Sequence, residues 1–300
     1  MLTPQTKATK LAKALGLNTD LYLKREDLHP FGSHKGRSIP KMIEIYGNKG
    51  HGKFCVSSSG NAALAAARYI NRLSGSGLKF RTELVIFVGK NIEPKKMDAL
   101  KKEAGSNHIT IHQVANPKRE ALKMENGDAA INLRQSTDDV ALIGYEELAD
   151  ELLQIKNLAA VFIPTSSGTT AQGLHEAFKK ADKNPQIHII QTMSCHPIVK
   201  ALPTKYKEER KDEVVEKSLA KAIVDLVGFR REAIAEAIKS SRGFGWVANN
   251  KDIEEAIELI KKTEKIVPSP NSALSLVGIT KALNRGLKFD GPIACILTGR

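Results

Sequence analysis

Short apolar segments alternate with helix-like segments along nearly the whole chain, and this alternation constrains the fold more than any other feature. The segments that read as strands are 21–24, 53–58, 83–89, 108–114, 159–166, 187–193 and 293–298. Segments with a helical period lie between them, at 36–46, 60–73, 93–105, 144–157, 170–182 and 251–265. Such alternation predicts α/β architecture with largely parallel sheets. The highly charged segment 204–221 is expected to be a surface helix or loop.

Two of the predicted strands end in a turn of small polar residues that leads directly into a helix. Strand 53–58 runs into the sequence SSGN (58–61), and strand 159–166 runs into SSGTT (166–170). Ligands gather at the carboxyl ends of parallel strands, and hydroxyls with backbone N–H groups at a helix N-terminus suit an anion. Each turn taken alone is equally well explained as a helix cap. Neither matches a nucleotide-binding glycine motif, so nucleotide binding is not indicated.

A third feature is Lys35, within the sequence LKREDLHPFGSHKGR (23–37). It follows a Pro-Phe-Gly-Ser turn and opens a predicted helix, whereas most lysines of the chain lie among glutamates. The residues alone leave two interpretations open: Lys35 is one more solvated lysine, or it is a lysine positioned to react.

Composition narrows the class of protein. The chain has 300 residues, of which 41% are hydrophobic and 26% charged, as in globular proteins of one or two domains. No apolar run approaches the roughly 18 residues of a membrane span, and the N-terminus lacks a signal peptide's apolar core, so we predict a cytoplasmic protein. Cys55, Cys195 and Cys295 lie in or near apolar runs and are expected to be buried hydrophobes. The histidines form no ligand motif, and no metal site is predicted.

The net charge of +13 raises the question of a nucleic-acid partner. Two features argue against it. Only 5% of residues are aromatic, which leaves few rings for bases to stack on. The lysines are also interleaved with acids, as in KEERKDEVVEK (207–217), which is typical of solvated helix faces. We predict a small anionic substrate rather than a nucleic acid or a membrane.

Several segments, in the same order along the chain, resemble the fold-type II family of pyridoxal-phosphate (PLP) enzymes. They are TPQTKATKLAKALG with DLYLKRED, GSHKGR, SSSGNAA, PTSSGTTAQG, PSPNSALSLVG and the terminal ILTG. The family includes threonine synthase, serine/threonine dehydratase, cysteine synthase and the tryptophan synthase β chain. The resemblance implies two α/β domains with mostly parallel sheets and the cofactor in the cleft between them. It places a large PLP-binding domain at 1–38 and 141–300 and a smaller inserted domain at 39–140, and a homodimer is expected.

The resemblance also implies a role for each unusual residue. Lys35 would hold PLP as a Schiff base, and Asn61 would face the 3-oxygen of the cofactor. Thr298 would lie at the pyridine nitrogen, where a neutral hydroxyl leaves that nitrogen largely unprotonated. The substrate carboxylate would be bound by Ser58, Ser59, Gly60 and Asn61. The cofactor phosphate would be bound by Ser166, Ser167, Gly168, Thr169 and Thr170.

Within the family the sequence is most similar to threonine synthase. The similarity rests on SSGNAALAAARY, the SSGTT turn, Thr298, and REAIAEAIKSSRGFGWVANNKDIEEAI before the PSPNSA segment. It implies a PLP-dependent carbon–oxygen lyase that converts O-phosphohomoserine to threonine and phosphate by γ-elimination and β-addition of water. A serine/threonine dehydratase, another β-eliminating or replacing enzyme, and a non-catalytic PLP carrier remain as alternatives. Candidate donors to the substrate phosphate are Lys24, Arg25, His34 and Arg242.

The sequence departs from the family pattern at two places. The SSGTT turn has a single glycine, where the phosphate loop of relatives usually has more. Ser269 stands before the proline of the PSPNSA segment, where many relatives have an acid. Hydroxyl groups are therefore expected to take over part of the phosphate binding.

Overall fold

The computed structural model describes residues 2–74, 82–105, 108–208 and 216–299. It divides into two compact units, a large unit of Met1–His29 with Tyr145–Arg300 and a small unit of Pro30–Gly144. These limits differ from the boundaries after residues 38 and 140 that we inferred from the sequence. A boundary after residue 38 would cut helix α2 (Lys35–Asn48), which runs through that position without a break. Lys35 consequently lies in the small unit.

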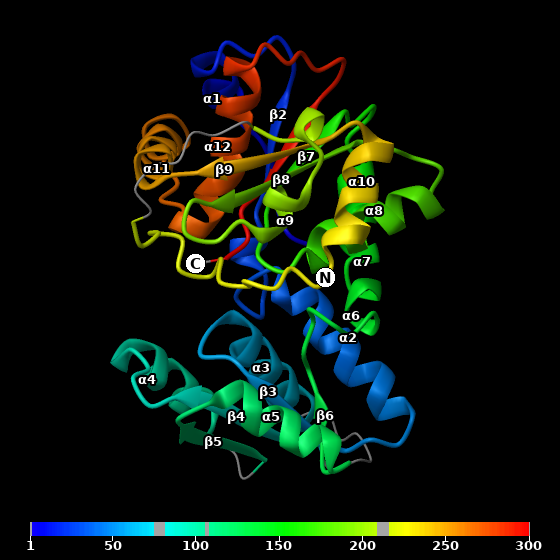
Figure 1. Cartoon of the computed structure of the whole chain (residues 1–300), viewed down its shortest axis with the longest axis vertical. Helices are drawn as coiled ribbons and strands as arrows, with labels where there is room; N and C mark the ends of the chain where they lie inside the picture. The colour runs from blue at the N-terminus through cyan, green and yellow to red at the C-terminus, as the bar shows by residue number, and fades with distance from the viewer. Residues whose placement is uncertain (1, 75–81, 106–107, 209–215, 300) are drawn as a thin grey trace. The chain divides into compact units, whose positions relative to one another are not determined.

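The large unit is built on a six-stranded sheet in the order β1-β2-β10-β7-β8-β9 (Figure 1). β1 is antiparallel to β2, and every other neighbouring pair is parallel. The strands are β1 (Gln5–Lys7), β2 (Leu21–Lys24), β7 (Ala160–Pro164), β8 (Gln186–Thr192), β9 (Phe244–Ala248) and β10 (Ile293–Ile296). β10 lies between β2 and β7, so strands from the beginning, middle and end of the chain are neighbours.

Helices cover both faces of this sheet, because alternate residues of each strand point to opposite faces. Val161 and Ile163 of β7 pack on one face and Phe162 on the other. The first face carries α7 (Glu146–Leu153), α8 (Thr169–Lys180), α9 (Pro197–Ala201) and α10 (Arg231–Ser241). The second face carries α1 (Thr9–Ala14), α11 (Asn250–Glu264) and α12 (Pro270–Asn284). Short 3-10 helices are η1 (Glu26–Leu28) and η2 (Thr204–Tyr206).

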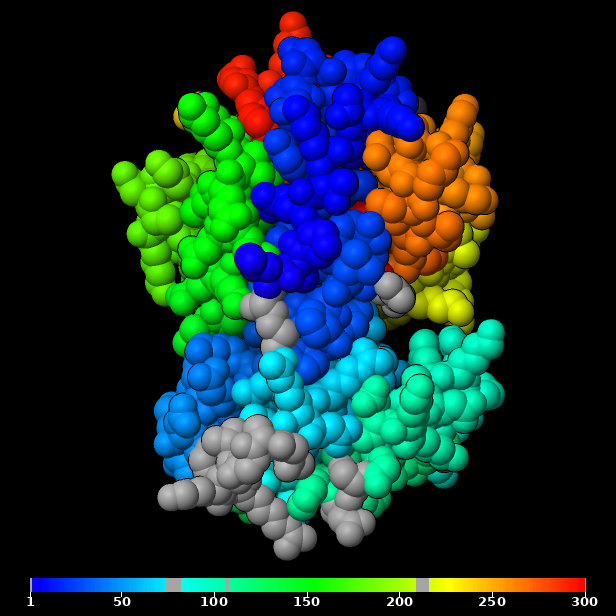
Figure 2. Space-filling view, turned by 180° about the vertical axis from the view of Figure 1, so that it is seen from behind, coloured from blue at the N-terminus to red at the C-terminus, as the bar shows by residue number. Residues whose placement is uncertain are grey.

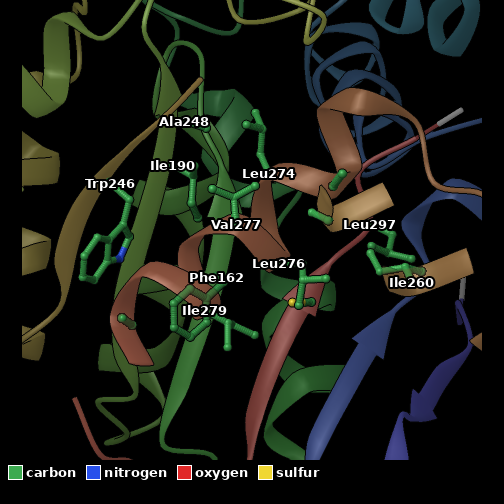
Figure 3. Close-up of a cluster of buried hydrophobic side chains, with 14 of the residues drawn as sticks. Phe162, Ile190, Trp246, Ala248, Ile260, Leu274, Leu276, Val277, Ile279 and Leu297 are labelled. Carbon is green, nitrogen blue, oxygen red and sulfur yellow. The ribbon is translucent and has the colours of Figure 1, made fainter. Parts of the chain in front are cut away.

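α12 lies in the middle of the second face, where its apolar side chains pack on Phe162, Ile190 and Trp246 (Figure 3). Gly278 permits this close packing. A Cβ atom at Gly278 would lie 2.6 Å from Cγ1 of Ile190 and 2.9 Å from Cδ1 of Phe162. At the surface of the same unit α1 lies beside α11 (Figure 2), and the Leu11 N–H donates to the Glu264 carboxylate at 2.8 Å.

The small unit contains a four-stranded, fully parallel sheet in the order β5-β4-β3-β6. The strands are β3 (Lys53–Ser57), β4 (Glu83–Gly89), β5 (Ile109–Val114) and β6 (Ile131–Asn132). Besides α2, its helices are α3 (Asn61–Ser74), α4 (Pro94–Glu103), α5 (Pro117–Asn126) and α6 (Val140–Ile143). One apolar core joins α2, α3 and the central strands.

The predicted α/β architecture with mostly parallel sheets is confirmed, and each of the expected strands and helices is present. The three cysteines are buried and unpaired, and burial raises the pKa of the Cys55 and Cys295 thiols to about 12, so their interpretation as buried hydrophobes is confirmed. Of the charged segment 204–221, η2 is described, while 209–215 lies outside the described residues. Across the described ranges no helix is long and apolar enough to span a membrane, and no cluster of three potential metal ligands occurs.

Candidate active site

The loop that carries Lys35 is fixed to helix α3. Phe31 is buried and packs edge-on against Tyr69 of α3, with ring centroids 5.7 Å apart. Gly32 has φ +91°, a conformation that side chains other than glycine's rarely adopt, and the Arg68 side chain occupies the space that a Cβ atom there would need. The PFG sequence before Lys35 is thus explained by one glycine conformation and one ring contact with α3.

Lys35 begins α2 and is half-buried. The backbone N–H of Lys35 donates a hydrogen bond to the buried Ser33 hydroxyl at 3.2 Å. α2 leads through a short loop to the amino end of β3, so the start of α2 lies at the carboxyl end of that strand. β3 ends in the 58–61 turn, where the Ser58 hydroxyl accepts from the Gly60 N–H at 3.2 Å, and α3 begins at Asn61.

Lys35 and Asn61 are therefore the first residues of two neighbouring helices at one edge of the small sheet. α2 and α3 pack against each other, which brings the Lys35 loop close to the 58–61 turn. Ser58, Ser59, Gly60 and Asn61 are all partly exposed. The fold of the small unit thus brings together Lys35 and residues 58–61, which we expected to serve one site.

In the large unit the 166–170 turn joins β7 to α8. Gly168 is the N-cap of α8 with φ +92°, and a Cβ atom at this position would lie 2.9 Å from Cγ1 of Ile234. A glycine N-cap supplies no side chain to cap the helix, so the N–H groups of the first turn are suited to an external anion. The Ser167 and Thr169 hydroxyls are 3.0 Å apart, and Thr169 and Thr170 are buried.

Ser166 makes contacts of a different kind. Its hydroxyl accepts hydrogen bonds from the N–H groups of Val224 at 3.1 Å and Asp225 at 3.2 Å. Its carbonyl accepts from the Gln191 amide at 3.3 Å. These partners could not be predicted from the sequence, because they are 25 to 59 residues away from Ser166 along the chain.

Thr298 is buried and lies two residues after the end of β10. The residue before it, Leu297, is held by a hydrogen bond from its N–H to the Lys24 carbonyl at 2.9 Å and one from the Asp27 N–H to its carbonyl at 2.8 Å. Since β10 pairs in parallel with β7, Thr298 and the 166–170 turn lie at the carboxyl ends of adjacent strands. The structure thus places both large-unit parts of the predicted cofactor site at one sheet edge.

The PSPNSA segment is hydrogen-bonded to Gly299, the residue that follows Thr298 at this edge. The hydroxyls of Ser269 and Ser272 donate to the Gly299 carbonyl at 2.6 and 2.8 Å, and the Gly299 N–H donates back to the Ser272 hydroxyl at 3.2 Å. Ser269 is also the N-cap of α12. From the sequence we treated this segment only as a family motif. Its role is to fix the residue that follows Thr298.

Two of the four side chains proposed as donors to the substrate phosphate do not lie at the predicted site. Lys24 is 1% exposed, and its ammonium group pairs with the Glu151 carboxylate and donates to the Thr3 carbonyl. Arg242 lies just before β9, at the amino edge of the sheet rather than the carboxyl edge. Those two predictions are corrected for this reason.

The remaining two lie in segments that adjoin the predicted site residues. Arg25 follows β2 and is paired with Asp27 through two contacts of 2.8 Å. His34 directly precedes Lys35 at the start of α2. His34 is therefore the candidate that lies nearest in sequence to the proposed reacting lysine.

The donors in the two units fit the chemical parts of a pyridoxal phosphate. An aldehyde needs an amine, which Lys35 supplies, and a phosphate needs N–H and hydroxyl donors, which the 166–170 turn supplies. A buried hydroxyl at Thr298 is a neutral partner for a ring nitrogen. The structure places Lys35 with residues 58–61 in one unit and the 166–170 turn with Thr298 in the other.

Comparison with known proteins identifies the family of the chain. The family model described as "Pyridoxal-phosphate dependent enzyme" matches residues 2–299, so the chain belongs to this family. Curated relatives include the threonine synthase of Methanocaldococcus jannaschii, 26% identical over 310 residues that cover 99% of this chain and 74% of the relative. The threonine synthase of Bacillus sp. (strain ULM1) is 26% identical over 307 residues, 99% of this chain and 82% of the relative.

Solved structures share the fold. Maize serine racemase superimposes with a TM-score of 0.79 at 17% identity, covering 99% of this chain and 87% of that one. Threonine deaminase isoform 2 of Solanum lycopersicum gives a TM-score of 0.79 at 22% identity, covering 99% and 83%. The chain is a PLP-dependent enzyme of fold type II. Its threonine synthase relatives fit the lyase class inferred from the sequence.

Proposed function

We propose that this enzyme converts O-phosphohomoserine and water into threonine and inorganic phosphate. The observation that carries the proposal is that several curated relatives that match 99% of the chain, at 24–26% identity, are threonine synthases. In this reaction the bond between Cγ and the phosphate oxygen breaks, and the oxygen of water ends on Cβ. PLP, when bound, supplies an electron sink for the carbanion that each proton removal creates.

The roles of the chain's own residues follow from where they lie. Nζ of Lys35 would hold the cofactor at rest and, when released, remove the α-proton and return protons to the substrate carbon atoms. The 58–61 turn, at the start of α3 beside Lys35, would bind the substrate carboxylate through its N–H groups and hydroxyls. The Thr298 hydroxyl is a neutral partner for the pyridine nitrogen, which favours elimination over transamination.

The substrate phosphate requires donors of its own. Lys24 is buried in an ion pair, which leaves His34 and Arg25 as the candidates from the original set. The net charge of +13 would attract a dianionic substrate, and that attraction weakens with added salt. Neutral serine or threonine would not show this dependence.

The alternative is a serine/threonine dehydratase. It is favoured by the fold similarity to threonine deaminase, which at 22% identity concerns the fold alone. Both reactions use a lysine, a carboxylate site and a phosphate turn, so the residues described above serve either one. Only products distinguish the two.

The test is to incubate the PLP-loaded enzyme with O-phosphohomoserine, threonine and serine in separate reactions. We expect phosphate and threonine in equal amounts from O-phosphohomoserine, at a rate that falls as salt is raised, and weaker formation of ketoacids from the other two. Lys35→Ala is the control that should abolish both activities. Efficient deamination of threonine or serine with phosphohomoserine untouched would establish the dehydratase instead.

A further inference from the structure

Residues 222–230, which we call the 222–230 segment, run beside the 166–170 turn in the large unit. The segment exposes a row of large apolar side chains: Val224 is 62% exposed, Leu226 75%, Val227 52% and Phe229 49%. Burial of these side chains therefore contributes little to its stability. Ile223 and Arg230 near the two ends of the segment are buried, whereas the stretch 224–227 between them has few buried contacts. Such a stretch opens at a low free-energy cost, so its hydrogen bonds decide how well it is ordered.

Between Val224 and Gly228, two side chains hold four backbone N–H groups, while the Ala222 N–H at the start of the segment donates to the Asn271 side chain at 3.0 Å. The Ser166 hydroxyl accepts from the N–H groups of Val224 and Asp225 at 3.1 and 3.2 Å. The Asp225 carboxylate accepts from the N–H groups of Val227 and Gly228 at 3.0 and 3.1 Å. Asp225 thus shapes the segment internally, and Ser166 ties it to the turn.

The far end of the segment is attached to α8, the helix that follows the turn. Arg230 is 6% exposed, and its guanidinium donates to the Gln172 side chain at 2.8 Å in the first part of α8. A Cβ atom on Gly168 would lie 3.4 Å from the Arg230 Cβ. The segment is consequently held to the turn through Ser166, and its last residue lies next to Gly168 and binds Gln172.

A serine hydroxyl has two acceptor sites and one proton to donate. In Ser166 the two N–H groups of the segment occupy the acceptor sites, which leaves the proton to be donated in a direction that those two bonds fix. A hydroxyl that accepts two hydrogen bonds is polarised and becomes a better donor. An anion in the 166–170 turn is the partner that such a donor suits best.

We propose that Ser166 couples occupancy of the 166–170 turn to the order of the 222–230 segment. A phosphate group in the turn accepts the Ser166 proton, strengthens the two bonds from Val224 and Asp225, and so stabilises the segment. Because coupling is reciprocal, an ordered segment raises the affinity of the turn for phosphate by the same factor. Ser166 is in this sense a positioning residue, and the inference rests on the proposed assignment of the turn to the cofactor phosphate.

The experiment measures amide hydrogen exchange of the full-length protein with and without PLP, at saturation judged by the cofactor's absorbance. In the parent protein PLP should slow exchange in the peptide that contains Val224 and Asp225 by about tenfold or more, the factor expected for one hydrogen bond to a charged group. Ser166→Ala should exchange faster there without PLP and gain no protection at saturation. Ser166→Thr, which keeps a hydroxyl, should restore part of the effect.

Ser167→Ala is the matched control, since Ser167 lies in the same turn and its hydroxyl pairs with the Thr169 hydroxyl at 3.0 Å rather than with the segment. It should bind PLP more weakly and yet show full protection of the segment once saturated. A second measurement uses Asp225→Ala, which loosens the segment without touching the turn. This change should lower PLP affinity several-fold in the parent background and have no further effect in Ser166→Ala.

Equal protection of the segment in parent and Ser166→Ala at saturation would overturn the coupling, and so would additive effects of Ser166→Ala and Asp225→Ala. Threonine formation without segment protection would remove only this inference. Protection without threonine formation would remove only the proposed reaction. A parent protein that takes up no PLP would overturn both.

Discussion

At the scale of single residues, Lys24 shows what burial does to an interpretation from sequence. In the sequence it stands beside Arg25 near the predicted reacting loop and is a reasonable donor to a substrate phosphate. In the structure Lys24 is among the most buried charged groups described. Its ammonium group forms an ion pair with Glu151 and donates a hydrogen bond to the Thr3 carbonyl. Nothing local in the sequence indicates this, because Glu151 is 127 residues away.

This pair leads to a stability prediction. Glu151→Ala leaves the Lys24 ammonium buried without its carboxylate, and we expect a loss of about 3–5 kcal/mol in the free energy of unfolding. Glu146→Ala, which breaks the exposed pair between Glu146 and Lys180, is the control and should cost about 0–1 kcal/mol. Urea unfolding of both variants measures the difference. Equal small losses in the two would show that Lys24 finds water or another acceptor.

At the scale of elements, the hydrophobic periodicity located seven strands and six helices. It missed the helices α5, α10 and α12, although α12 is 15 residues long; α12 is apolar on nearly all sides, so it shows little amphipathic period. It also missed the strands β1, β6 and β9. β1 and β6 are only three and two residues long and depend on pairing with β2 and β3. β9 has the sequence FGWVA, in which Gly245 weakens any strand signal.

That glycine has a packing reason that only the structure reveals. A Cβ atom on Gly245 would lie 2.5 Å from Cδ1 of Leu202 and 3.2 Å from Cγ2 of Val199. β9 therefore needs a glycine where α9 approaches the sheet. The 58–61 and 166–170 turns were easier to predict, because their polar residues are consecutive in the sequence. The residues that support the predicted site come from distant parts of the chain: Ser272 is hydrogen-bonded to Gly299, and the 222–230 segment is hydrogen-bonded to Ser166.

One residue of β8, His188, makes the stability of the protein depend on pH. His188 is fully buried and stacks on Phe162 with ring centroids 4.4 Å apart, and its Nδ1 accepts from the Trp246 indole N–H at 3.1 Å. Burial lowers the pKa of His188 from 6.5 to about 3. His188 is therefore protonated below about pH 6.5 in the unfolded chain but only below about pH 3 in the folded chain. As the pH falls through this range, His188 lowers the free energy of unfolding.

His188→Gln should remove this contribution while keeping hydrogen-bonding groups at the position. Between pH 6 and 4 the free energy of unfolding of the parent should fall more steeply than that of the variant, by about 1.4 kcal/mol per pH unit. Urea unfolding of the cofactor-free proteins at several pH values gives both slopes. Parallel slopes would mean that His188 is protonated in the folded protein.

At the scale of the whole molecule, the sequence predicted the fold class, but it placed Lys35 in the larger domain, whereas Lys35 belongs to the small unit. Lys35 and the 58–61 turn meet at one edge of the small sheet, and the 166–170 turn and Thr298 meet at one edge of the large sheet. Local chemistry and strand order suffice for this, because carboxyl ends of parallel strands lie together. The choice of substrate is different in kind, since the residues described serve synthase and dehydratase chemistry alike.

The central claim is that Lys35 holds PLP, and one measurement tests it directly. The protein is reconstituted with PLP, reduced with borohydride and digested, and the modified peptide is identified by mass spectrometry. We predict an absorption band of the lysine–cofactor linkage that is lost on reduction, with the label on Lys35. Lys35→Ala should lack the band, while Lys41→Ala, a change of a partly exposed lysine of the same helix paired with Glu44, should retain it. A label on another lysine, or an unchanged band in Lys35→Ala, would contradict the account.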